Sequence, residues 1–213
     1  MSGVAATLES DIRAAFRAQL LALVMPAAPN TALTAAGRTL GAPGVDFAAL
    51  GFQPGDYATT TLSNNLGPYK ITRVDVGQLT FANQLVAQAA AGVISVPLPP
   101  VAWENDEFEP VPGQPFLEEV VRVIDSSPRG AGSAGYEQHT ILATLALVYP
   151  AGQGTLGAES MVGRLKTVFR PGQGLSYGEN AGTIMKSGPG AKVSQAPWLR
   201  CPFTVQLLCW TTG

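Results

Sequence analysis

YEQHTILATLALVY, residues 136–149, is the stretch of sequence that decides the fold class. In an extended strand, successive side chains point to opposite faces. One face of this strand would carry Ile141, Ala143, Leu145 and Leu147, and the other would carry Thr140, Leu142, Thr144 and Ala146. Because both sets are largely apolar, the pattern predicts a long strand that is covered on both faces.

The segments on either side extend this strand into an antiparallel sheet. Residues 116–125 predict a second strand, and the glycine-rich connection over residues 126–135 predicts that the two strands form a long hairpin. Three further strands are predicted over residues 183–186, 192–195 and 199–210.

Two amphipathic helices are predicted to pack on this sheet. The first has a stripe formed by Leu8, Ile12, Phe16, Leu20 and Leu23, and it ends before Pro26. The second has a stripe formed by Ala158, Met161, Val162, Leu165, Val168 and Phe169, and it ends at Pro171 and Gly172. The order helix, strands, helix, strands predicts an α+β domain with an antiparallel sheet packed by two amphipathic helices.

Residues 26–97 differ in amino-acid composition from the rest of the chain. They are rich in alanine and glycine and carry few charges, with short strands expected at residues 57–62, 69–76, 78–81 and 93–96. Segments rich in proline and glycine bound this region at both ends. We therefore expect a small β-rich insert over residues 26–97, within a domain formed by residues 1–25 and 98–213.

The composition narrows the class of function. Only 13% of the 213 residues are charged and the formal net charge is -2, which excludes a strongly basic binder of nucleic acid. A surface with so little charge is typical of a chain that buries part of itself against other subunits. Neither a membrane-spanning segment nor a signal peptide is predicted.

The sequence offers little for catalysis. The single histidine, His139, shares strand parity with Ile141, and Cys201 and Cys209 lie on an apolar strand, so all three are expected to be buried structural residues. No phosphate-binding loop, dinucleotide fingerprint or nucleophile-elbow motif is present. We expect no enzyme activity, no cofactor and no metal ion.

Two charged clusters stand out. The acids Glu104, Asp106, Glu107, Glu109, Glu118 and Glu119 fall within 16 residues, and the basic residues Arg164, Lys166 and Arg170 crowd the end of the second helix. The spacing of the acids does not match an EF-hand loop. The acids could repel passing DNA from a pore, pair with the basic cluster of a neighbouring subunit, or form a solvated loop. The flanking aromatics Trp103 and Phe108 favour contact with protein.

Several motifs resemble those of one protein family. The sharpest is Ala102-Trp103-Glu104-Asn105 followed by Phe108 and Pro110. The strand that closes in Tyr149-Pro150-Ala151-Gly152 and the run Trp198-Leu199-Arg200-Cys201-Pro202 add to it. Over residues 4–25 and 98–213 the chain resembles the tail terminator proteins of siphophages.

The resemblance implies a structural virion protein that is made in the host cytoplasm. It implies a homohexameric ring that caps the tail-tube protein, joins a head-completion or connector protein of the neck, and lets genomic DNA pass without specific binding. The candidate subunit-interface or lumen residues are Trp103, Glu104, Asp106, Glu107, Phe108, Glu109, Arg164, Lys166 and Arg170.

Two other functions stay open on the residues alone. One is a head-completion or connector ring of the neck, and the other is a tail-tip or decoration protein that binds a host surface through the insert. A tail-tip binder would be monomeric or trimeric and would bind cells, whereas a terminator would form six-fold rings on tail tubes.

Overall fold

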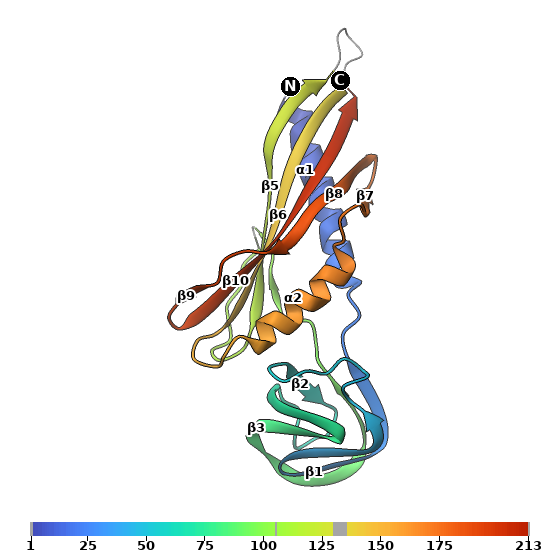
Figure 1. The fold of residues 1–213 in the computed structure, drawn as a ribbon, viewed down its shortest axis with the longest axis vertical. Coiled ribbons are helices and arrows are strands. Elements are labelled where there is room, and N and C mark those ends of the chain that lie inside the picture. The colour runs from blue at the N-terminus through green and yellow to red at the C-terminus, as the bar shows by residue number, and fades with distance from the viewer. Residues whose placement is uncertain (1, 105, 130–135, 213) are drawn as a thin grey trace. The chain divides into compact units, whose positions relative to one another are not determined.

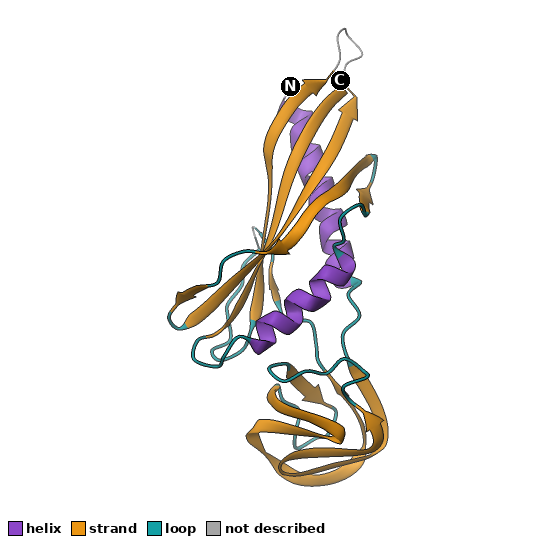
Figure 2. Cartoon of the chain, viewed as in Figure 1, coloured by secondary structure: helices purple, strands orange, loops and turns teal. Residues whose placement is uncertain are grey.

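The computed structural model describes residues 2–104, 106–129 and 136–212. The chain divides into two compact units. The first unit comprises Met1–Leu23, Pro100–Ala151 and Met161–Gly213, and the second comprises Val24–Pro99 and Gly152–Ser160. Figures 1 and 2 show the elements of each unit.

A seven-stranded sheet organises the first unit, in the order β4-β5-β6-β10-β8-β7, with β9 also paired to β10. Its strands are β4 (Val101–Ala102), β5 (Phe116–Arg129), β6 (Tyr136–Pro150), β7 (Gly174–Tyr177), β8 (Asn180–Pro189), β9 (Val193–Gln195) and β10 (Trp198–Thr212). β5 and β6 pair antiparallel from Phe116↔Val148 to Arg129↔Tyr136, which confirms the predicted hairpin and extends its strands.

The helices α1 (Ser2–Leu21) and α2 (Leu156–Val168) supply the apolar side chains that cover this sheet. Leu8, Ile12, Phe16 and Leu20 of α1 are fully buried, as their spacing predicts. Phe16 stacks on Phe169 with ring centroids 4.6 Å apart, and Phe169 lies 6.4 Å from Phe203 of β10. The core of the first unit therefore runs from α1 through the end of α2 to the sheet.

The two faces of the long central strands differ, so the expectation that both are covered is wrong. On β10, the alternate residues Phe203, Val205 and Leu207 are fully buried, while Thr204 and Gln206 between them are half-buried. β6 alternates in the same way. Within the described residues, the second face is lined by threonine, alanine, glutamine and leucine side chains that are partly open to solvent.

The second unit is a three-stranded sheet in the order β1-β3-β2. It comprises β1 (Ala27–Asp46), β2 (Tyr57–Thr60) and β3 (Tyr69–Ser95). β1 pairs antiparallel with β3, and β2 pairs parallel with it. The sheet curls around its own core, in which Phe47, Phe52 and Phe81 are buried.

The predicted α+β class is wrong, because the protein is mostly β, with 56% of its residues in strands and only two helices among the described residues. The error arises in the second unit. Alanine and glycine are depleted in strands, so residues 27–46 gave no strand signal and β3 was expected as short pieces. In the structure the long pairing between β1 and β3 overrides this propensity, and Gly37 and Gly77, with φ of 58° and 73°, allow the ribbon to bend.

Candidate interaction site

The two aromatic side chains of the Trp-Glu-Asn segment are engaged within the chain. The Arg17 guanidinium lies over the Trp103 ring, 4.7 Å from its centroid. Phe108 packs on Phe116 at a centroid distance of 5.3 Å, and Phe116 contacts the Trp198 ring edge-on at 5.2 Å. Trp103 and Phe108 are each half-buried by these contacts. They anchor the loop that follows β4 and leave only part of their surface for another molecule.

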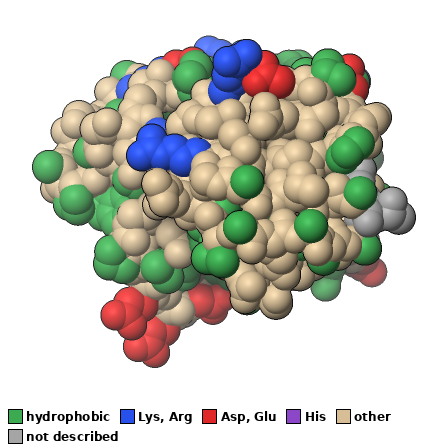
Figure 3. Space-filling model, turned by 90° about the horizontal axis from the view of Figure 1, so that it is seen from below, with side chains coloured by type: hydrophobic (Ala, Val, Ile, Leu, Met, Phe, Trp, Pro, Cys, Tyr) green, Lys and Arg blue, Asp and Glu red, His purple; other side chains and the backbone are tan. Residues whose placement is uncertain are grey.

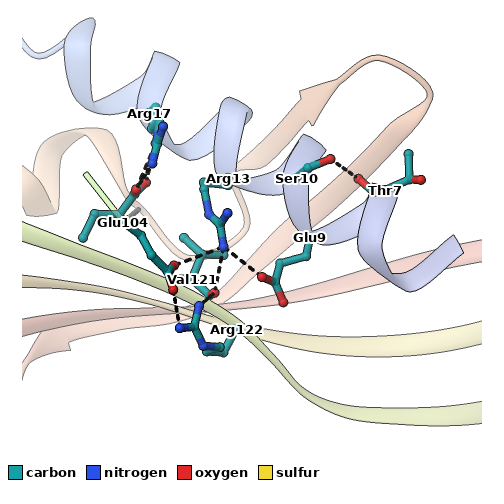
Figure 4. Close-up of polar contacts among 9 residues, drawn as sticks. Thr7, Glu9, Ser10, Arg13, Arg17, Glu104, Val121 and Arg122 are labelled. Carbon is teal, nitrogen blue, oxygen red and sulfur yellow. Dashed lines mark hydrogen bonds and ion pairs between the residues drawn. The ribbon is translucent and has the colours of Figure 1, made fainter. Parts of the chain in front are cut away.

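Glu104 belongs to an ion-pair network that connects α1 to β5 (Figure 4). Its carboxylate accepts a hydrogen bond from Arg13 Nη2 at 3.0 Å and pairs with Arg122. Arg13 Nη2 also donates to Glu9 Oε1 at 2.8 Å. The hydrogen bond from Arg122, helped by the backbone amide of Val121 and by Arg13, holds the pKa of Glu104 below its ordinary value despite the opposing effect of burial. Glu104 is therefore a structural anion.

Glu119 is paired even more closely. It is buried, and Arg17 donates to its two oxygens from Nε at 2.8 and 3.1 Å and from Nη2 at 2.6 Å. These hydrogen bonds raise the pKa of Arg17. Glu118 is paired in the same bidentate manner with Arg200 of β10. Three of the six clustered acids thus neutralise arginines of their own chain.

Asp106, Glu107 and Glu109 remain as the outward part of the cluster. All three are exposed, and within residues 2–104, 106–129 and 136–212 none of them has an ion-pair partner at salt-bridge distance. Of the basic residues, Lys166 and Arg170 are exposed and Arg164 is half-buried. The structure does not pair these acids with these bases inside one copy.

The arginines that neutralise the acids were missed by the sequence analysis as site residues. Arg13 and Arg17 are four residues apart, off the apolar stripe of α1, so the spacing showed that they share a helix face. Their partners lie about 90 to 100 residues away in sequence, and no local pattern connects them.

His139 and the cysteines are packing residues, as their strand parity indicates. His139 is buried, and its ring nitrogens contact Ser126 Oγ at 2.8 Å and Thr211 Oγ1 at 2.9 Å. Cys201 and Cys209 are buried and form no disulfide, and burial raises the pKa of the Cys209 thiol to about 11. A thiol with this pKa stays protonated near neutral pH and is a poor nucleophile.

The described residues form neither a metal-binding cluster nor a membrane-spanning helix. No group of three or more histidine, cysteine, aspartate or glutamate side chains is arranged to hold a metal ion. Neither α1 nor α2 has the length and apolar character needed to cross a bilayer.

The family model for phage tail terminator protein matches residues 80–207, from β3 to β10, which is more than half of the chain. The chain belongs to the phage tail terminator family, and this confirms the resemblance found in the sequence.

Other comparisons add little. No curated protein matches the chain. A solved structure without a descriptive name is 22% identical, covers 52% of this chain and 78% of its own, and aligns with a TM-score of 0.44.

Proposed function

We propose that this protein terminates the tail of a siphophage by forming a homohexameric ring on the last ring of tail-tube subunits. The ring stops tube polymerisation and presents its other side to a head-completion or connector protein of the neck. The family match over residues 80–207 is the observation that carries this proposal. It establishes a component of the phage tail, and the ring, the cap and the neck contact are what we propose for it.

The surface chemistry supports assembly. Figure 3 shows a face on which uncharged side chains dominate and lysine and arginine are sparse. On the half-buried second face of β6, Thr140, Leu142, Thr144 and Ala146 are likewise uncharged. A surface with so few charges is a poor basis for solubility on its own, so burying part of it against other subunits is favourable.

The charge balance suits a channel for DNA. Each copy contributes a formal net charge of -2, so a closed ring would not attract the phosphates of the genome. Genomic DNA would pass through such a ring without specific binding.

Electron microscopy of the purified protein, alone and mixed with tail tubes, tests the proposal. We expect six-fold rings in class averages and a ring at one end of each tube, and we expect tubes with added protein to stop elongating. A protein that stays monomeric, or trimers that bind cells and leave tube growth unchanged, would contradict a terminator.

A further inference from the structure

The large sheet ends in β4 and β5 on one side and in β8 and β7 on the other. At one end, β4 pairs with β5 only at Leu117 and Glu118, so among the described residues the rest of β5 has a strand partner on one side alone, β6. At the other end, β7 pairs with β8 and with no other strand of the part of the chain that the structure describes. β6 and β10 lie between β5 and β8, so the two ends face away from each other in the sheet.

The β5 end presents apolar side chains and negative charge. Val120 and Ile124 of β5 are 43% and 54% exposed. The loop that follows β4 carries the exposed acids Asp106, Glu107 and Glu109. Among the described side chains of β5, the exposed base Arg122 pairs with Glu104. We call this set of residues the acidic end.

The β8 end presents apolar side chains and positive charge. Tyr177 of β7 and Met185 of β8 are each 54% exposed. The segment after α2 runs beside β8, because Gly172 N donates to Ile184 O and Ser187 Oγ donates to Phe169 O. This arrangement brings three exposed bases to one end of the sheet: Lys166, Arg170 and Lys186. The turn between β7 and β8 carries one opposing charge, Glu179. We call this set the basic end.

We propose that the acidic end of one copy docks on the basic end of the next copy, and that this contact joins neighbouring subunits of the ring. The occupant is a second copy because each chain carries both complementary surfaces, on opposite ends of one sheet. A contact between two different surfaces of identical chains is heterologous, and it closes into a ring when the rotation between neighbours permits. This inference rests on the ring proposed above.

The contact has the composition of a subunit interface. The exposed apolar residues of the two strand ends supply the area that loses water, and the opposite charges beside them fix which ends meet. A contact between two acidic ends, or between two basic ends, would place like charges together, which is unfavourable. The arrangement therefore selects a head-to-tail contact over a two-fold dimer.

Charge reversal tests the contact in the full-length protein. The variants E107K/E109K and K166E/R170E each place like charges across the proposed interface. We expect the protein concentration at which rings half-dissociate, measured by sedimentation, to rise at least about tenfold in each. The quadruple variant E107K/E109K/K166E/R170E restores opposite charges across the interface, and we expect it to form rings again.

Matched controls separate this contact from general effects of charge. Glu179→Lys adds positive charge to the basic end, and Arg38→Glu changes an exposed residue of β1 in the second unit. Both are expected to form rings like the wild type. Circular dichroism checks that every variant is folded.

The possible results distinguish the two proposals. Wild-type protein without rings, on tubes or free, contradicts the proposed function and removes the basis of the inference. Rings that form normally in both reversal variants, or that fail to form in the quadruple variant, overturn the inference and leave the terminator function intact. Loss of rings in each reversal variant, with recovery of rings in the quadruple variant, supports the proposed contact.

Discussion

At the scale of single residues, the acidic cluster separates into carboxylates paired with arginines of the same chain and exposed carboxylates, which have different roles. Glu104, Glu118 and Glu119 each pair with an arginine of the same chain. Asp106 and Glu107 are exposed. The sequence located the cluster but not this division, because the arginine partners come from distant segments. Pairing across 82 to 102 residues depends on the finished fold.

Glu119→Gln should destabilise the protein by about 1–3 kcal/mol, because Arg17 loses its charged partner in a largely buried site. The Arg17 side chain keeps 28% of its surface exposed, so water offsets part of the loss. The control is Glu118→Gln, whose partner Arg200 is 37% exposed and whose loss should cost only about 0–1 kcal/mol. Urea denaturation measures both, and equal losses in the two variants would contradict the distinction.

The stability of the protein should fall in acid partly through Glu104. The pKa of this carboxyl is lower in the folded protein than its ordinary value of 4.5, chiefly because of the hydrogen bond from Arg122. Its contribution is therefore fully present above about pH 4.5 and is lost as the pH falls through the folded-state pKa. Glu104→Gln should flatten the dependence of the free energy of unfolding on pH in this range. An unchanged slope would show that the network does not stabilise the ionised form.

At the scale of elements, the helices, the hairpin and parts of β2 and β3 were predictable, whereas β1 and the full length of β3 were not. The apolar stripe of α1 and the long apolar run of β6 are strong signals, because burial in the core imposes them. β1 has no such signal and β3 has it only in short pieces, because both strands are rich in alanine and glycine. Their lengths of 20 and 27 residues follow from pairing with each other, which local sequence does not encode.

Phe16→Ala should destabilise the first unit by about 3–5 kcal/mol, through lost burial and the cavity left beside Phe169. Leu165→Ala, at a fully buried position of α2, should cost about 2–5 kcal/mol. Leu21→Ala is the control, because this side chain is 64% exposed and its loss should stay within about 0.5 kcal/mol. Calorimetry would contradict the packing if all three variants melted together.

Gly55→Ala should disrupt the second unit. Gly55 has a φ of 95°, and an added Cβ would lie 2.9 Å from the carbonyl carbon of Leu156 and closer still to the amide of Gly157. Both backbone strain and steric overlap oppose the change, so we expect the free energy of unfolding to fall by more than about 2 kcal/mol. Gly44→Ala is the matched control, since its φ is 80° but no atom lies within 4 Å of the added Cβ. Equal losses would assign the whole effect to backbone strain.

At the scale of the whole molecule, the boundary at residues 26–97 is a proposal about which parts fold on their own. The second compact unit contains Val24–Pro99 and also Gly152–Ser160. That short segment is held by polar contacts: Ser160 Oγ donates to Asp56 Oδ1 at 2.9 Å, and Tyr57 OH donates to Gln153 Oε1 at 2.6 Å. Composition alone gave no reason to join these distant segments.

Replacing residues 26–97 with a short linker should leave the sheet of the first unit folded, because its core is formed by α1, the end of α2 and the strands that follow residue 100. The melting temperature should nevertheless fall, since Gly152–Ser160 would lose Asp56 and Tyr57. Ser160→Ala in the full chain is the comparison, because it removes one of these contacts and nothing else of the second unit. Ser160→Ala should lower the free energy of unfolding by about 1–3 kcal/mol, because it leaves the buried Asp56 without that donor. Circular dichroism and thermal melting give the result, and a deletion variant that shows no cooperative unfolding would mean that residues 26–97 belong to the core of a single domain.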